Sequence, residues 1–252
     1  MKPVSILISS FMGGKAVELC TESIRQRTEY KPYKIVVYDS SGEGTAERKY
    51  LRDQESSGNV ELLTYEIQTM HDNAIPQLLE YCDTPLACLI DSDVEIVARD
   101  WLSIMAHQIS SPRIMGIGRY KGEGCIIHSR TYVAPTFQPL CLMLNMQSYR
   151  KIHRPDLWVH DSTKIAQYRG REIFAKYKQD FNTVWGDVGW RFAEEVLFGD
   201  NDFVMKRLPH GWLGGKIIHY GQMSSNHARP DFPQIKARRL HIEKNLKRLR
   251  RG

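Results

Sequence analysis

The first half of the chain alternates between short apolar runs and longer amphipathic segments. The apolar runs are rich in Val, Ile and Leu, as buried strands are, and the segments between them repeat apolar residues at helical spacing. This alternation predicts a mostly parallel sheet with helices on both faces. The predicted strands are Val4–Ser9, Tyr33–Tyr38, Val60–Glu66 and Leu86–Ile90. The predicted helices are Ala16–Arg27, a segment beginning after an N-cap at Thr45, and His71–Tyr81.

After Asp93 the pattern becomes less regular. Pro139–Met146 is apolar throughout, so we expect it to lie in the core, whereas residues 150–190 are polar and aromatic and indicate no clear element. Two further helices and three further strands are predicted. The helices are Trp101–Ile109 and Gly189–Phe198. The strands are Ile114–Gly118, Tyr132–Phe137 and Lys216–Tyr220.

Composition places this pattern in a globular protein. The 252 residues are 42% hydrophobic, and no apolar run reaches the roughly 20 residues that a membrane helix needs. Met1-Lys2-Pro3 leads directly into a predicted strand, so we expect no signal peptide. The five cysteines are odd in number and show no C-x-x-C spacing, which predicts reduced, mostly buried thiols in a cytoplasmic protein.

Charge separates the C-terminal segment from the rest. Residues 235–252 hold eight of the 35 basic residues and one of the 29 acidic residues, which leaves 27 basic and 28 acidic residues elsewhere. Apolar residues recur in this segment at helical intervals, so it predicts a basic amphipathic helix. Such a helix could lie on anionic lipid at the inner face of the membrane, contact nucleic acid phosphates, or dock on its own domain with a solvated basic face.

The stretch that ends the Leu86–Ile90 strand carries the clearest candidate chemistry. Asp91 and Asp93 follow that strand directly, and ligand sites in α/β sheets lie just past the carboxyl ends of strands. Two carboxylates around Ser92 are donors that suit Mg²⁺ or Mn²⁺. The alternative is an acidic turn that caps the next helix.

The order of these pieces resembles the family 2 glycosyltransferases, which have the GT-A fold. The similarity covers roughly residues 3–225 and rests on several short motifs in the right order. They are Val4-Ser5-Ile6-Leu7-Ile8-Ser9-Ser10-Phe11-Met12, Val37-Tyr38-Asp39-Ser40-Ser41-Gly42-Glu43-Gly44-Thr45, Asn73, Asp91-Ser92-Asp93 followed by Trp101-Leu102, Gly199-Asp200-Asn201-Asp202-Phe203-Val204-Met205-Lys206, and Ile217-Ile218-His219-Tyr220.

The sequence also departs from that family. Ser9-Ser10 stands where the family has Pro-Thr, and Gly199 replaces the usual Glu before the Asp that carries the base. The Gln-x-x-Arg-Trp motif of processive polysaccharide synthases is absent from the sequence. The resemblance therefore implies transfer of single sugars.

On the donor side, the resemblance implies a metal-bound nucleoside diphosphate sugar. Mn²⁺ or Mg²⁺ would be held by Asp91, Asp93 and His219, although His219 could also be an ordinary histidine at a strand end. Asp39 would accept a hydrogen bond from the nucleotide base, usually uracil, unless it only caps the following helix. The residues implied to bind the nucleotide sugar are Ser9, Asp39, Ser41, Asn73, Asp91 and Ser92.

On the acceptor side, an inverting transfer needs a carboxylate base within reach of the acceptor hydroxyl. Asp200 is the first candidate, Asp202 is the alternative and Asp187 is a third. Trp185, Asp187 and Trp190 are the candidates for binding the acceptor. The two tryptophans could stack on sugar rings, or they could be core residues.

These observations together predict a GT-A domain over residues 1–230 and a basic helical tail over residues 231–252. Residues 1–97 would form the nucleotide-sugar half and residues 98–230 the acceptor half. The predicted enzyme is a metal-dependent inverting glycosyltransferase that moves one sugar from a UDP-sugar to a hydroxyl on a saccharide, lipid-linked or nucleic-acid-linked acceptor. The alternatives are a retaining GT-A transferase, a DNA-modifying glycosyltransferase, a sugar nucleotidyltransferase, for which Phe11–Lys15 is a poor match, and a nucleic-acid-binding protein that uses the basic tail.

Overall fold

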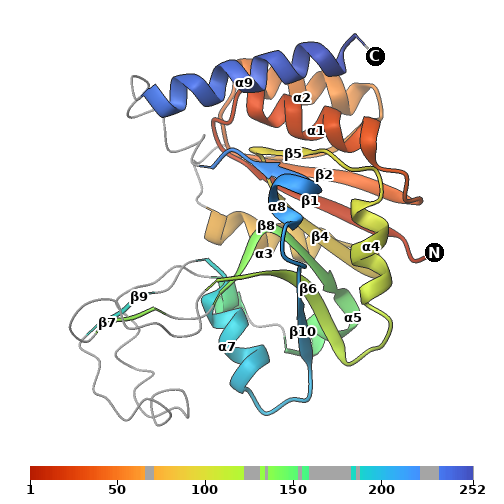
Figure 1. Ribbon diagram of the computed structural model, residues 1–252, viewed down its shortest axis with the longest axis vertical. Coiled ribbons are helices and arrows are strands. Elements are labelled where there is room, and N and C mark those ends of the chain that lie inside the picture. The colour runs from red at the N-terminus through yellow and green to blue at the C-terminus, as the bar shows by residue number, and fades with distance from the viewer. Residues whose placement is uncertain are drawn as a thin grey trace.

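The centre of the molecule is a seven-stranded sheet (Figure 1). The computed structural model describes residues 1–65, 71–121, 131–133, 136–152, 155–158, 183–185, 188–221 and 233–251. The strand order is β10-β6-β8-β4-β1-β2-β3, and β8 alone among these seven runs antiparallel to the others. The strands are β1 (Val4–Ser10), β2 (Tyr33–Asp39), β3 (Glu61–Thr64), β4 (Leu86–Asp91), β6 (Ile114–Lys121), β8 (Thr136–Asn145) and β10 (Val204–Arg207).

Helices cover both faces of this sheet because the inner strands are apolar on both sides. Along β1, Ile6 and Ile8 face one core cluster and Leu7 faces the other. The first face packs against α1 (Lys15–Arg27), α2 (Ala46–Ser56) and α4 (Trp101–Gln108). The second face packs against α3 (His71–Tyr81), α5 (Met146–Ile152), the short 3₁₀ helix η1 (Pro155–Trp158) and α7 (Trp190–Phe198).

Two small sheets accompany the main one. β5 (Val94–Ile96) pairs antiparallel with β11 (Ile217–His219), and β7 (Thr131–Val133) pairs parallel with β9 (Thr183–Trp185). A short segment, α8 (Trp212–Gly215), precedes β11, and its backbone departs from helical geometry at Leu213 and Gly214. The β5–β11 pair lies between the main sheet and the C-terminal helix α9 (Pro233–Leu249), so the end of the chain returns to the side of α1 (Figure 1).

The predicted fold class is confirmed as a mostly parallel sheet flanked by helices with a helical C-terminal segment. Thr45 is the N-cap of α2, since its side chain accepts a hydrogen bond from the backbone N–H of Arg48. The prediction of one strand over Tyr132–Phe137 is wrong, because β7 ends at Val133 and β8 begins only at Thr136. The apolar segment Pro139–Met146 does lie in the core, within β8 and the start of α5.

The basic tail is helical as predicted, and its apolar face is buried. Ile242, Leu246 and Leu249 pack against Ala16 and Leu19 of α1. The alternative in which the helix docks on its own domain describes this apolar face, and contact of its basic face with anionic lipid or nucleic acid stays a prediction. The outward face keeps most of the cations. Within the described part of the chain, none of the helices combines the length and apolar character needed to cross a membrane.

The described cysteines also match the expectation of buried thiols. All of them are buried and none forms a disulfide within the described residues: Cys20, Cys82, Cys88 and Cys141. Burial raises the pKa of each of Cys20, Cys88 and Cys141 far above that of a reactive thiol, so these are packing residues. Cys125 lies outside the described residues.

Candidate functional site

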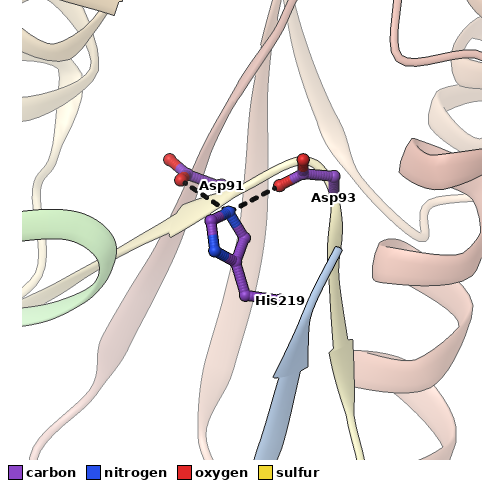
Figure 2. A group of neighbouring side chains, drawn as sticks. All are labelled: Asp91, Asp93 and His219. Atoms are coloured by element: carbon purple, nitrogen blue, oxygen red, sulfur yellow. Dashed lines mark ion pairs between the residues drawn. The ribbon is translucent and has the colours of Figure 1, made fainter. Parts of the chain in front are cut away.

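Asp91, Asp93 and His219 converge at the carboxyl edge of the sheet, as Figure 2 shows. Nε2 of His219 lies 3.1 Å from Oδ1 of Asp93 and 3.5 Å from Oδ2 of Asp91. One donor atom from each of the three side chains falls within 4.8 Å of the other two. The side chains of Asp91 and Asp93 are 24% and 11% exposed, so both are mostly buried but still reach solvent.

Local structure accounts for this convergence. Asp91 is the last residue of β4, where it pairs in register with Ser9 of β1. The turn through Ser92 then reverses the chain into β5, whose first residue, Val94, is the register partner of His219. The backbone N–H of Tyr220 also donates to the carbonyl of Asp93. β5 and β11 thus bring a histidine from late in the sequence against the two carboxylates.

The electrostatics of the group favour positive charge at its centre. Burial lowers the pKa of His219, but the hydrogen bonds to Asp91 and Asp93 and their negative charges raise it more, to about 10. Without a metal ion the imidazole is therefore cationic at neutral pH. Two carboxylate oxygens and an imidazole nitrogen are also ligands that Mn²⁺ and related divalent ions accept. The residues present fit the divalent cation that the sequence implied, and a bound cation would replace the proton on Nε2.

The loop between β1 and α1 borders this group and is fixed by a residue that sequence reasoning missed. Glu47 of α2 is buried, and its carboxylate accepts hydrogen bonds from the Ser10 hydroxyl at 2.6 Å and the Gly14 backbone N–H at 2.7 Å. A Cβ added to Gly13 would contact the hydroxyls of Ser92 and Ser10 at 3.4 and 3.5 Å. The loop therefore lies close against the Asp91–Asp93 turn. A Glu in the first turn of a helix gives no distinctive sequence signal, since such residues commonly favour the helix dipole.

Asp39 is enclosed within the protein at the end of β2. Its side chain is 0% exposed and pairs with the guanidinium of Arg48, which is also buried. Its other oxygen accepts the backbone N–H of Ser41. Both carboxylate oxygens of Asp39 are thus engaged inside the protein, and its contact with a nucleotide base stays a prediction. The helix-cap alternative is wrong, because Thr45 is the cap.

The other donor-side candidates lie in different environments. Ser9 and Ser92 are buried beside the metal candidates, at the ends of β1 and β4. Ser41 is buried in the turn after β2, where its hydroxyl lies 3.0 Å from that of Thr45. Asn73 is exposed in the first turn of α3. The structure thus brings Ser9 and Ser92 next to the Asp91 group.

Asp200 and Asp202 lie at the opposite edge of the sheet. Asp202 precedes β10, whose first residue pairs with the first residue of β6, and it forms an ion pair with Arg113 at 3.0 Å. β6 begins level with the start of β4, across β8. At about 3.3 Å per residue, the length of β4 puts roughly 20 Å between Asp202 and Asp91. The structure therefore does not bring Asp200 and Asp202 next to Asp91, because both residues precede β10 at the edge of the sheet where β4 begins. Their role as catalytic base stays a prediction.

The acceptor-side aromatic residues are only partly described. Trp190, the first residue of α7, is 1% exposed, which agrees with the core alternative, and its stacking on an acceptor sugar stays a prediction. The backbone of Trp185 belongs to β9, but its side chain lies outside the described part of the structure. Asp187 is outside it altogether.

No family model matches this sequence, and no curated protein matches it. Similar solved structures are glycosyltransferases with low identity to this chain. Mannosyltransferase PcManGT from Pyrobaculum calidifontis, in complex with GDP-Man and Mn²⁺, is 15% identical with a TM-score of 0.48, over 78% of this chain and 62% of that one. GalNAc-T7 with UDP, GalNAc and Mn²⁺ is 14% identical with a TM-score of 0.48, over 62% of this chain and 38% of that one.

The galactosyltransferase LgtC, in complex with donor and acceptor sugar analogs, is 13% identical with a TM-score of 0.48, over 81% of this chain and 72% of that one. This chain thus spans less than two thirds of the first two proteins. All three TM-scores lie below 0.5, so the function proposed below rests on the residues and contacts of this chain itself.

Proposed function

We propose that this protein is a metal-dependent glycosyltransferase that moves a single sugar from a nucleoside diphosphate sugar, with UDP as the nucleotide, to an acceptor hydroxyl. The observation that carries the proposal is the meeting of Asp91, Asp93 and His219 at the carboxyl edge of the sheet. The resemblance of the sequence to family 2 glycosyltransferases singles out these three residues. A lone Asp-x-Asp turn would not need a histidine from a distant strand.

The chemistry suits this edge of the sheet. A divalent cation stabilises the negative charge that develops on the departing nucleoside diphosphate. Asp91, Asp93 and His219 would hold the cation, and the partial burial of the two carboxylates would strengthen their attraction to it. The loop held by Glu47 would form one wall of the donor site next to the diphosphate. Ser9 and Ser92 would line the same wall.

One observation favours the retaining alternative. An inverting transfer needs a carboxylate base near the acceptor, and Asp200 and Asp202 are too far from the metal candidates. A retaining transferase with the same metal site needs no base at that position. Asp187 is the one remaining base candidate from the sequence, so an inverting enzyme should lose most of its activity in Asp187→Asn. NMR analysis of the product anomer separates the two cases directly.

The first test is ligand-dependent stability. Wild type and Asp93→Ala are melted with UDP, GDP, dTDP or CDP, each with and without Mn²⁺. A ligand at 100 times its Kd should add about 2.7 kcal/mol to the stability of the folded state. The proposal expects a shift for UDP that requires Mn²⁺ and disappears in Asp93→Ala but persists in Asp202→Ala. No Mn²⁺-dependent shift with any of the four nucleotides would contradict it.

Acceptor identity and cell location stay predictions. The outward cations of α9 could contact anionic lipid at the inner face of the membrane or the phosphates of a nucleic acid acceptor. A nucleic-acid-binding protein without transferase activity would bind DNA or RNA through 235–252 and ignore nucleotide sugars. If the protein only binds nucleic acid, neutralising the exposed Lys244 and Lys247 should abolish its binding to DNA or RNA. If it is a glycosyltransferase, the same change should leave the Mn²⁺-dependent stability shift with UDP unchanged.

A further inference from the structure

The inner face of α9 carries a polar cluster around one fully buried carboxylate. Glu95 of β5 is 0% exposed and accepts three hydrogen bonds. The Tyr220 hydroxyl donates at 2.6 Å, the Asn245 side-chain amide at 2.8 Å and the Arg248 guanidinium at 3.3 Å. The Asn245 amide also donates to the Tyr220 hydroxyl at 3.2 Å. Two of the three donors to Glu95 therefore come from α9.

The cluster lies directly behind the metal candidates. Glu95 is two residues beyond Asp93 on β5, and Tyr220 follows His219 at the end of β11. A third residue of α9, Arg238, donates to the carbonyl of Gly221 at 2.7 Å. A Cβ added to Gly221 would lie 3.7 Å from Cε1 of His219 and 3.8 Å from the same Arg238 guanidinium. Helix α9 thus contacts both strands of the β5–β11 pair next to the residues that would hold the cation.

The two strands cannot fix this geometry alone. β5 and β11 are three residues each, and a two-stranded pair of this length is marginally stable in water. Asp93 directly precedes β5, and His219 is the last residue of β11. A buried carboxylate that loses a donor is costly, so Glu95 strongly favours the arrangement in which Tyr220 and Asn245 are both in place.

We propose that α9 is a positioning element of the metal site: Asn245 and Tyr220, through Glu95, set the distance between His219 and Asp93. The inference rests on the proposed metal site. It assigns the basic C-terminal helix a role inside the domain that does not depend on its charge. Asn245 and Tyr220 are positioning residues, since neither side chain belongs to the Asp91–Asp93–His219 group.

The test measures Mn²⁺ affinity of the full-length, metal-free protein by EPR of free Mn²⁺, without any assay of transfer. The variants are Asn245→Ala, Tyr220→Phe and the double variant, with Arg250→Ala and Leu246→Ala as controls on the same helix. Arg250 pairs with Glu18 of α1, and Leu246 packs on α1, so each control removes an α9 contact outside the cluster. Urea unfolding of every variant reports its stability.

Changes around metal ligands commonly weaken metal affinity by 10–100-fold, and we expect Asn245→Ala to raise the Mn²⁺ Kd by about tenfold. Tyr220→Phe keeps the ring and should have a smaller effect in the same direction. The Mn²⁺ Kd of the double variant should rise by less than the product of the two single increases, because both side chains act on Glu95. Leu246→Ala should lower stability at least as much as Tyr220→Phe while leaving the Kd within about threefold of wild type.

The outcomes separate the two proposals. If wild type binds Mn²⁺ and Asp93→Ala does not, but Asn245→Ala and Tyr220→Phe bind like Arg250→Ala, the positioning role is overturned and the metal site stands. If Leu246→Ala weakens Mn²⁺ binding as much as Tyr220→Phe does, docking of α9 in general, and not this cluster, sets the site, and the positioning role is again overturned. If wild type and Asp93→Ala bind Mn²⁺ equally, the proposed function itself fails. Should Asn245→Ala not fold, Tyr220→Phe alone decides.

Discussion

Two Asp-x-Asp turns follow secondary-structure elements in this chain, and they have opposite environments. Asp91-Ser92-Asp93 ends β4 at the carboxyl edge of the sheet, where both carboxylates are largely buried and meet His219. Asp200-Asn201-Asp202 joins α7 to β10 at the other edge, where Asp202 is 72% exposed and pairs with Arg113, itself 70% exposed. The residue pattern is the same in both places.

The difference shows what makes a carboxylate pair chemically useful. At the first turn, a third segment of the chain supplies an imidazole, and the surrounding protein removes most of the water. At the second turn, solvent screens the charges, and an exposed ion pair contributes little. We therefore expect every substitution that compares the two edges to have a large effect at the first and almost none at the second.

The largest expected effect is on catalysis. Asp93→Ala should lower the rate of sugar transfer by about 10³-fold, since stabilisation of the leaving group by a metal ion is worth several kcal/mol. Asp202→Ala should stay within about twofold of wild type. Steady-state kinetics with a UDP-sugar donor, the acceptor supplied as a pool of free saccharides, measures both. Equal losses in the two variants would erase the distinction between the turns.

The arginine partners of the carboxylates should differ in stability. Arg48→Met leaves the buried carboxylate of Asp39 without its cation, which typically costs about 3–5 kcal/mol. Arg113→Met removes an exposed partner of Asp202 and should cost less than about 1 kcal/mol. Urea unfolding gives both free energies. A small cost for Arg48→Met would mean that Asp39 can open to solvent, and a contact with a nucleotide base would again be conceivable.

The histidine sharpens the comparison at the level of metal binding. His219→Ala removes one of three donors and should weaken Mn²⁺ binding by about 10–100-fold. His210→Ala, an exposed histidine between β10 and α8, is the matched control and should not change it. Calorimetric titration with Mn²⁺ measures the two affinities. Unchanged affinity in His219→Ala would restrict the metal site to the carboxylates.

The smallest expected effect is a pH dependence at Glu47. Burial raises the pKa of this carboxyl group, and the hydrogen bonds from Ser10 and Gly14 offset part of that increase. The folded protein therefore binds a proton at Glu47 more tightly than the unfolded chain does. The free energy of unfolding should fall as pH rises from the ordinary pKa of a glutamate to the raised pKa of Glu47, and it should recover as pH falls back through this window.

Urea unfolding between pH 4.5 and pH 7 should show this slope in wild type and lose it in Glu47→Gln. Asp202→Asn, at the opposite edge, should keep the slope of wild type. A slope that persists in Glu47→Gln would mean that another group titrates in this window.

Local pattern predicted much of the fold. The apolar runs located β1, β2 and β4, and helical periodicity located α1 and α3 nearly to the residue. The sequence did not predict where one strand ends and the next begins, as at Tyr132–Phe137, which splits between β7 and β8. It also could not tell Trp190 in the core from Trp190 on a binding surface, because an aromatic side chain serves either purpose.

Some residues of the candidate site could be identified from the sequence, and others could not. Asp91 and Asp93 could be identified from the sequence because they directly follow a buried strand. Asp39 looked equally well placed, yet Arg48 of the next helix takes its carboxylate. Glu95 and Asn245 gave no signal, since their partnership joins β5 to α9 across most of the chain.

The sequence by itself thus determined the alternation of strands and helices, the edge of the sheet that carries Asp91 and Asp93, and the helical, basic character of the C-terminus. These follow from side-chain pattern over short distances, which acts on the chain before any long-range contact forms. Only the tertiary structure decided that His219 joins the first Asp-x-Asp turn, that the second turn lies at the far edge, and that α9 holds the β5–β11 pair through Glu95. The physical reason is that register and packing between distant segments choose the neighbours of each charge, and those neighbours determine whether it is screened, neutralised or available to a ligand.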